Sequence, residues 1–289
     1  MPHRYLLTAL VAGLALTVAG CGISIFPVWP PLFFDEPPAE VGPFAVREYR
    51  VDVPEGADGQ PAGITVFAPT GATDPLPALV WVLGSNVQAY YHQSLHETLA
   101  SWGYAVIVSD GRPLVLDDFQ YHRRTVDLAK QAVDLAVAGE LDVTIDAARI
   151  AAGGYSIGGT MATFLAAEDS RIQSVVLWAP TSAPFWLGVD PVVLFPQVNQ
   201  PVLFLLAELD NVAPPEEFPQ EMQDQMPQAD ISAFIIPQGL HLFFQQPDAA
   251  DSVADPATTL TRFEQQGIAI ERTRAYLDEQ LAGDAADAE

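Results

Sequence analysis

The chain of 289 residues contains only one cysteine, Cys21, and only one lysine, Lys130. A single cysteine excludes a disulfide within the chain, so the lone thiol needs another explanation. Basic residues are scarce as well, because 12 Lys and Arg stand against 37 Asp and Glu, for a formal net charge of −25. A surface this acidic repels nucleic acid and anionic lipid headgroups. We therefore expect no nucleic acid among the partners.

The one cysteine follows an N-terminal segment that is typical of an export signal. His3 and Arg4 precede an uncharged apolar run over residues 6–19, which has the length and composition of a secretory signal. The run leads into residues 18–21 (VAGC), which resemble the lipobox of bacterial lipoprotein signals. This resemblance implies cleavage before Cys21 and a diacylglycerol on its thiol. The protein would then be exported and lipid-anchored, through Cys21, to a bacterial cell membrane or outer membrane.

An uncleaved membrane anchor is the alternative for this segment, since no charged residue lies between Arg4 and Asp35. The prolines at positions 27, 30 and 31 would end such a spanning helix near Phe26. Either interpretation leaves a domain that is tethered outside the cytoplasm.

The chain divides along these lines into a leader, a spacer, a domain and a tail. Residues 1–20 are predicted as a lipoprotein signal peptide, and residues 21–43 as the lipidated cysteine with a spacer rich in proline and aromatic residues. Such a spacer is extended and stiff rather than helical. Residues 44–283 have the size of a single α/β domain, and residues 284–289 form an acidic tail.

Within the domain, apolar runs alternate with amphipathic stretches. The runs at 78–83 and 104–109 are typical of strands that are covered on both faces, and residues 119–138 have the spacing of a long helix. Strands that alternate with helices imply a mostly parallel sheet, here of about eight strands with helices on both faces. No large cap insert is visible, so a fairly open site is expected. Further strands are expected at 46–53, 64–69, 173–178, 202–207 and 231–236, and further helices at 91–102, 216–225 and 260–281.

Residues 149–168 predict a short apolar strand, a serine between glycines, and a helix. Gly154, Ser156 and Gly158 fit the pattern G-x-S-x-G of a nucleophile elbow. A serine on this sharp turn is pushed out of the sheet, and the turn closes only if its neighbours lack Cβ atoms. The helix that begins at Ile157 points its N-terminal amides at the serine. The Ile157 N–H would therefore stabilise an anion on a substrate carbonyl.

Plain packing or a phosphate cradle is the alternative for this glycine-rich turn. However, no G-K-[ST] follows it, and residues 153–159 do not form a clean G-x-G-x-x-G. A nucleophilic serine also needs an acid and a histidine later in the chain, in that order.

Asp210 and His241 meet this requirement. Asp210 follows the strand at 202–207, at the sheet edge where ligands bind in open α/β sheets, and Glu208 is the competing acid. His241 follows the next strand. In this interpretation His241 takes the proton of Ser156 and returns it to the leaving group, while Asp210 fixes the imidazole tautomer.

Several motifs carry a resemblance to a known family, at residues 83–86 (LGSN), 99–110 (LASWGYAVIVSD), 154–159 (GYSIGG), 207–214 (AELDNVAP) and 239–241 (GLH). From about residue 77 to residue 244 the chain resembles the dienelactone-hydrolase-like branch of the α/β-hydrolases. Within that branch it is similar to cutinase-type polyester hydrolases and platelet-activating-factor acetylhydrolases. The resemblance implies the α/β-hydrolase fold and favours Asp210 over Glu208 as the acid.

The resemblance also implies the rest of the site. In this family the loop after the third strand supplies the second oxyanion amide, here the backbone N–H of Ser85, with Asn86 as the alternative register. Aromatic side chains near the serine line the family's substrate pocket. The substrate-binding residues implied here are Tyr155, Asn86, Phe185 and Trp186.

Residues 181–200 join two expected strands through an apolar segment marked by prolines. Core packing is the default interpretation, and a short flap over the serine is the alternative. Thr181 occupies a position where the resembled family has an aromatic residue. The shape of the acyl or polymer site therefore departs from the family pattern.

His92 and His96 share a helical face at i, i+4 and could hold a metal ion. No third ligand at a useful spacing is apparent, and the pattern H-E-x-x-H is absent. We therefore expect no metal and no cofactor.

Together these residues predict a serine carboxylic-ester hydrolase that forms an acyl-enzyme with a small-molecule or polymeric ester. The preference for esters comes from the resemblance, because a Ser-His-Asp triad does not itself distinguish esters from amides. The alternatives are a peptidase or amidase with the same triad, and a non-catalytic surface lipoprotein that uses the fold for binding.

Overall fold

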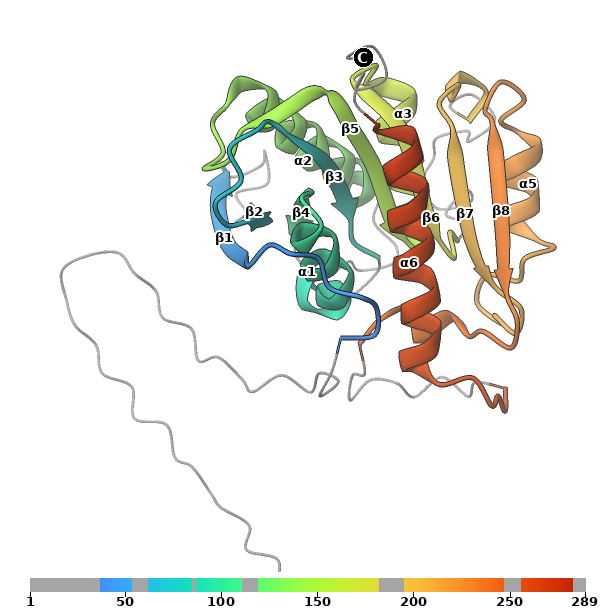
Figure 1. Cartoon of the computed structure of the whole chain (residues 1–289). Helices are drawn as coiled ribbons and strands as arrows, with labels where there is room; N and C mark the ends of the chain where they lie inside the picture. The colour runs from blue at the N-terminus through green and yellow to red at the C-terminus, as the bar shows by residue number, and fades with distance from the viewer. Residues whose placement is uncertain are drawn as a thin grey trace, which may run out of the picture. The chain divides into compact units, whose positions relative to one another are not determined.

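The apolar runs of the chain form one central sheet of eight strands, shown in Figure 1. The structure is a computed structural model that describes residues 37–53, 62–84, 87–110, 119–181, 195–246 and 256–282. The strands are β1 (Val46–Val53), β2 (Ala62–Pro69), β3 (Leu76–Val82), β4 (Ala105–Asp110), β5 (Ile145–Tyr155), β6 (Ile172–Trp178), β7 (Val202–Ala207) and β8 (Ile231–Ile236). The predicted α/β class and the size of the sheet are confirmed.

The sheet is mostly parallel, with the strand order β1-β2-β4-β3-β5-β6-β7-β8. β2 pairs antiparallel with both β1 and β4, and the other neighbours are parallel. The apolar run of β3 fits a strand that is covered on both faces, because Leu79, Val80, Trp81 and Val82 are fully buried. The carboxyl ends of β3 to β8 meet at one edge, so the loops that follow these strands converge there.

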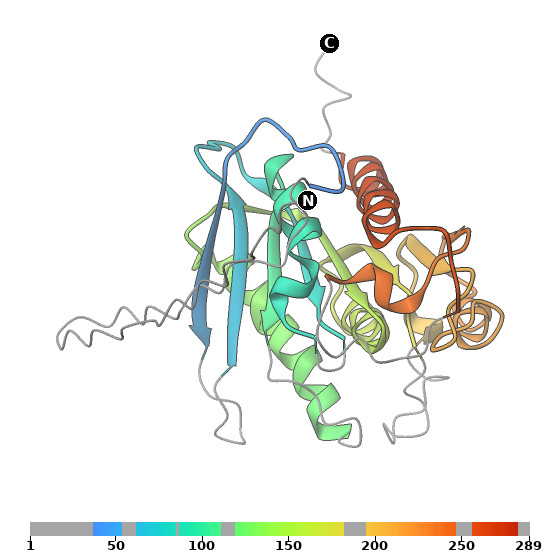
Figure 2. The same ribbon diagram turned by 90° about the horizontal axis from the view of Figure 1, so that it is seen from below.

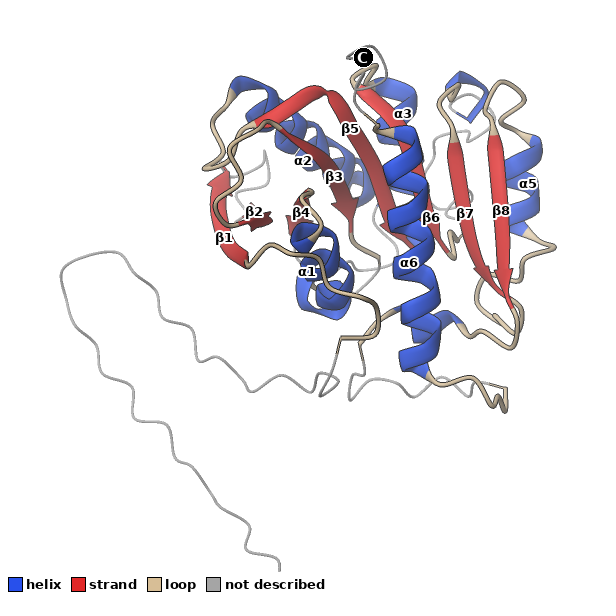
Figure 3. Cartoon of the chain, viewed as in Figure 1, coloured by secondary structure: helices blue, strands red, loops and turns tan. Residues whose placement is uncertain are grey.

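Helices cover both faces of the sheet (Figures 2 and 3). From β3 onward an α-helix lies between consecutive strands, except that the described residues between β6 and β7 contain only a short 3₁₀ helix, Phe195–Gln197. Side chains of α1 and α6 share one buried cluster with one face, and side chains of α2, α3 and α5 share a second cluster with the other face. None of the described helices has the length and apolar character needed to cross a bilayer. The helices are α1 (Gln93–Ser101), α2 (Phe119–Ala138), α3 (Ile157–Glu168), α5 (Phe218–Asp224) and α6 (Arg262–Gln280).

The residues before β1 pack on α1 and α6. The N–H of Gly42 donates to Ser101 Oγ (2.8 Å), and the indole N–H of Trp102 donates to the carbonyl of Glu40 (2.9 Å). The carbonyl of Pro38 passes so close to α6 that a Cβ atom on Gly267 would lie 2.4 Å from its oxygen. The last residues of the predicted spacer therefore contact the domain.

Candidate active site

Ser156 lies on the turn between β5 and α3, with a φ of 57° and a ψ of −130°. This backbone conformation is unfavourable for a residue with a Cβ atom, and such strain is concentrated at functional sites. The N–H of Ser156 donates to the carbonyl of Trp178 (2.9 Å), which ties the turn to the end of β6. The serine is thereby fixed at the carboxyl edge of the sheet.

The glycines on either side of the serine are required by close backbone contacts. A Cβ atom on Gly154 would lie 2.3 Å from the carbonyl oxygen of Gly158, and one on Gly158 would lie 2.3 Å from that of Val82. Both contacts involve backbone atoms, which cannot swing aside as a side chain can. The expectation that this turn closes only without Cβ atoms is confirmed.

His241 approaches the serine from the segment that follows β8. Its Nε2 lies 3.2 Å from Ser156 Oγ, and its Nδ1 lies 2.7 Å from Asp210 Oδ2. The imidazole and the carboxylate are almost completely buried, with 4% and 0% of their side-chain surface exposed. The sheet thus brings together three residues that are far apart in the sequence.

Asp210 is held in place by its own loop. Its Oδ1 accepts from the N–H groups of Val212 (2.8 Å) and Ala213 (2.7 Å), so its other oxygen faces the imidazole. A carboxylate beside Nδ1 fixes the hydrogen on that nitrogen and leaves Nε2 as an acceptor toward the serine hydroxyl. The competing acid, Glu208, is exposed and accepts from the backbone N–H of Gln238 (2.7 Å).

Tyr155 supports His241 from inside the domain. Its hydroxyl donates to the carbonyl of His241 (3.1 Å), and its ring centre lies 5.0 Å from the imidazole. The centre of the His92 ring also lies 5.1 Å from that of Tyr155, and only 2% of Tyr155 is exposed. The described contacts of Tyr155 are therefore those of a support for His241, and its contact with substrate stays a prediction.

Thr181, which departs from the aromatic residue of the resembled family, is a neighbour of the serine. Its Oγ1 lies 3.4 Å from Ser156 Oγ, and its carbonyl accepts from the hydroxyl of Thr160 (2.7 Å). The signal that could have found it is its position three residues after the end of β6, the strand beside the elbow strand.

Several predicted site residues lie outside the described part of the chain. They are Ser85, Asn86, Phe185, Trp186 and Cys21. Ile157, in contrast, is the first residue of α3. The first amides of a helix have no partner within it, so they remain available to an anion.

His92 and His96 are buried in the layer between the sheet and α1. The indole N–H of Trp81 donates to His92 Nδ1 (3.3 Å), which places the hydrogen of this imidazole on Nε2 and makes that nitrogen a donor. Burial lowers the pKa of His92 to about 3. Burial, and then the nearby His92, hold the pKa of His96 well below its usual range. Among the described residues, no group of three or more His, Cys, Asp or Glu could hold a metal ion.

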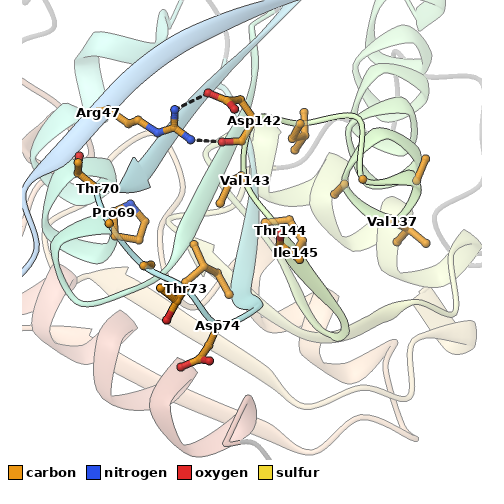
Figure 4. A pocket seen from close by; sticks show the side chains of 17 residues that line it. Arg47, Pro69, Thr70, Thr73, Asp74, Val137, Asp142, Val143, Thr144 and Ile145 are labelled. Atoms are coloured by element: carbon orange, nitrogen blue, oxygen red, sulfur yellow. Dashed lines mark hydrogen bonds and ion pairs between the residues drawn. The ribbon is translucent and has the colours of Figure 1, made fainter.

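A pocket of about 640 Å³ lies at the opposite edge of the sheet, where β3 and β5 begin and α2 ends (Figure 4). Arg47 spans part of its wall by donating to the carboxylate and the carbonyl of Asp142. Ser156, Asp210 and His241 are not among the residues that line it. This pocket is therefore separate from the cluster around the serine.

A comparison with curated proteins finds no match for this chain. The family described as PET hydrolase-like matches residues 37–264, a range that contains the elbow and the strands and loops around it. This match covers more than half of the chain and agrees with the α/β-hydrolase fold described above. The chain therefore belongs to the PET hydrolase-like family and is a hydrolase of the esterase and cutinase type.

Proposed function

We propose that this protein is a serine carboxylic-ester hydrolase that works through a covalent acyl-enzyme on Ser156. The observation that carries the proposal is the chain of contacts from Ser156 Oγ to His241 Nε2 (3.2 Å) and from His241 Nδ1 to Asp210 Oδ2 (2.7 Å). A serine on a strained turn, a base within reach, and an acid that orients the base are the parts that acyl transfer requires. The family supports an ester as the substrate, either a small molecule or a polymer.

Acylation is the first stage of the proposed mechanism. Ser156 Oγ attacks the ester carbonyl carbon while its proton moves to His241 Nε2, and the Asp210 carboxylate stabilises the imidazolium. The carbonyl oxygen becomes an oxyanion, which the Ile157 N–H and the predicted Ser85 N–H would stabilise. The bond from carbon to the alcohol oxygen then breaks, and His241 gives its proton to that oxygen.

Deacylation uses the same groups in reverse. His241 removes a proton from a water molecule as the water oxygen attacks the acyl carbon. The bond between that carbon and Ser156 Oγ breaks, and the proton returns from His241 to the serine. The products are a carboxylic acid and an alcohol, and the enzyme is restored.

An ester series with a matched amide tests the proposal. We expect the protein to hydrolyse p-nitrophenyl esters of increasing acyl length and to act far more slowly on the corresponding p-nitroanilides. Ser156→Ala should abolish hydrolysis while leaving the thermal unfolding transition in place. A preference for the anilide would favour the amidase alternative, and a folded protein without either activity would favour a binding protein.

We also propose that the domain is tethered to a membrane through a lipid on Cys21. The apolar run at residues 6–19 and the VAGC sequence at residues 18–21 support this proposal, as does the lack of any other cysteine. In cells given a labelled fatty acid, the full chain should incorporate the label and sediment with membranes. Cys21→Ala should lose the label, and incorporation that survives this substitution would contradict the tether.

A further inference from the structure

We propose that the first turn of α6 positions His241, with Gln265 and Arg262 as the positioning residues. This inference rests on the proposed role of His241 as the general base. The start of α6 lies beside the carboxyl ends of β7 and β8 (Figure 1). His241 follows β8 in the chain. His241 begins a short 3₁₀ helix, His241–Phe244, so its position depends on what holds that segment.

Gln265 holds the residue directly before the histidine at both of its backbone groups. Its Oε1 accepts from the N–H of Leu240 (2.9 Å), and its Nε2 donates to the carbonyl of Leu240 (2.8 Å). Gln265 is completely buried. A side-chain amide can donate and accept at the same time, so it pairs with this backbone much as a neighbouring strand would.

Arg262 holds the residues that follow the histidine. Its Nη1 donates to the carbonyls of Leu242 (2.6 Å) and Gln245 (2.7 Å), and its guanidinium lies over the ring of Phe243, 5.0 Å from the ring centre. Hydrogen bonds to a charged donor are stronger than those between neutral groups. The backbone is thus held on both sides of His241, and Tyr155 holds the carbonyl of His241 itself.

The helix start that carries these two side chains is itself fixed by a capping box. The Thr261 hydroxyl oxygen accepts from the N–H of Glu264 (3.2 Å), and the Glu264 carboxylate accepts from the N–H of Thr261 (2.8 Å). This reciprocal pair satisfies two amides of the first turn and stops it from fraying. The first turn of α6 is therefore a rigid base for the histidine.

Catalysis is sensitive to this kind of support. His241 Nε2 must stay within hydrogen-bond distance of Ser156 while Nδ1 stays on Asp210, and a misplacement of about 1 Å can lower a rate by about 10²-fold. Loss of the Gln265 amide would leave the N–H of Leu240 without its partner, and the carbonyl of Leu240 would keep only the hydrogen bond from the N–H of Phe243 (3.2 Å). The segment would then shift to satisfy the buried N–H.

Gln265→Met tests the proposal, because methionine keeps the length of the side chain and removes both hydrogen bonds. Gln266→Met is the matched control, since Gln266 is the next residue in the same turn and is only 2% exposed. Its amide nitrogen has no hydrogen-bond partner within the described part of the chain, and its amide oxygen accepts a long hydrogen bond from Gln246 Nε2 (3.4 Å). We expect Gln265→Met to lower kcat for a p-nitrophenyl ester by about 10- to 100-fold with little change in KM. Gln266→Met should keep kcat within about twofold of the native value.

Proton NMR gives a readout that does not depend on ester hydrolysis. The Nδ1 proton of His241, shared with Asp210, should give a downfield resonance that disappears in His241→Ala. We expect this resonance to shift or broaden in Gln265→Met and to persist in Gln266→Met. If the native protein hydrolyses no ester, the proposed function fails, and this resonance still tests the positioning.

Two results would overturn the proposal. One is a Gln265→Met protein with native kcat and a native His241 resonance. The other is an equal loss in both methionine variants, which would indicate general core packing. Arg262→Met is the second test if Gln265→Met fails to fold, because Arg262 is only partly buried. It should lower kcat and broaden the same resonance, and native behaviour in this variant would count against the proposal.

Discussion

Buried histidines occur in two contrasting environments in this molecule. His241 has Asp210 on one ring nitrogen and Ser156 on the other, at 2.7 and 3.2 Å. His92 receives one hydrogen bond from Trp81, and neither ring nitrogen of His96 has a partner among the described residues. Burial alone makes an imidazole resist protonation. In the proposed mechanism, the carboxylate and the hydroxyl beside the two ring nitrogens of His241 make it a proton carrier. The role expected of each buried histidine therefore depends on its hydrogen-bond partners rather than on its being a histidine.

The largest expected effect comes from deleting the histidine that has partners. His241→Ala should lower kcat for ester hydrolysis by about 10⁴- to 10⁶-fold, because the serine loses its proton acceptor. The measurement is a steady-state rate on a p-nitrophenyl ester, with circular dichroism as a check on folding. A folded variant that keeps a tenth of the native rate would contradict the proposed role of His241 as the proton acceptor.

The next effect tests which acid orients the imidazole. Asp210→Asn should lower kcat by about 10⁴-fold, because an amide can hold the wrong tautomer of His241. Glu208→Gln is the matched control, since Glu208 contacts the backbone of Gln238 rather than the imidazole. Equal losses in the two variants would contradict the assignment of Asp210.

Much of the fold could be predicted because each strand and helix has a regular apolar pattern. The expected ranges 46–53, 119–138, 202–207 and 231–236 agree with the bounds of β1, α2, β7 and β8. The start of β5 could not be predicted, since its first residues include Asp146 and Arg149, which form an ion pair (2.7 Å) in place of an apolar run. A polar, partly exposed strand has no period that a sequence reveals.

The cluster around Ser156 could be predicted from order and spacing, because each of its residues follows an apolar strand. The contacts of Gln265 and Arg262 could not, since they cross from a helix to a distant loop. A polar residue at a helix start usually faces solvent, so only its place one turn before the apolar positions 269 and 270 could have suggested burial. The spacing of His92 and His96 fits a metal pair, but spacing alone does not reveal that both residues are buried.

The third effect is a pH dependence of stability from the two histidines without carboxylate partners. Burial lowers the pKa of His92 to about 3 and that of His96 in the same direction, so the unfolded chain binds more protons below about pH 6.5. The free energy of unfolding should therefore fall as the pH is lowered from about 6.5 toward 3, by up to about 1.4 kcal/mol per pH unit for each group. Urea unfolding at a series of pH values measures this slope.

The matched comparison for this slope is the double variant His92→Phe, His96→Leu. The free energy of unfolding of this variant should depend less on pH between about 5 and 6.5, a range in which carboxylates stay charged. If the free energy of unfolding of the double variant fell with pH as steeply as that of the native protein, other groups would be the cause of the loss of stability.

The smallest expected effect is on stability and comes from replacing His96, the buried histidine without described hydrogen-bond partners. His96→Leu removes two ring nitrogens that lack partners among the described residues and leaves a side chain of similar volume. We expect it to raise the free energy of unfolding at neutral pH by about 1 kcal/mol, without a change in kcat. A loss of stability of that size would show that the nitrogens of His96 are hydrogen-bonded in solution.

Covalent trapping of Ser156 tests its proposed role as the nucleophile most directly. A soluble protein that begins after Cys21 would be treated with a fluorophosphonate probe, and the adduct would be mapped by mass spectrometry. We expect a single adduct on Ser156 that forms slowly or not at all in His241→Ala and Asp210→Asn, and at the native rate in Glu208→Gln. A folded protein that takes no label, or takes it on another residue, would contradict the nucleophilic role proposed for Ser156.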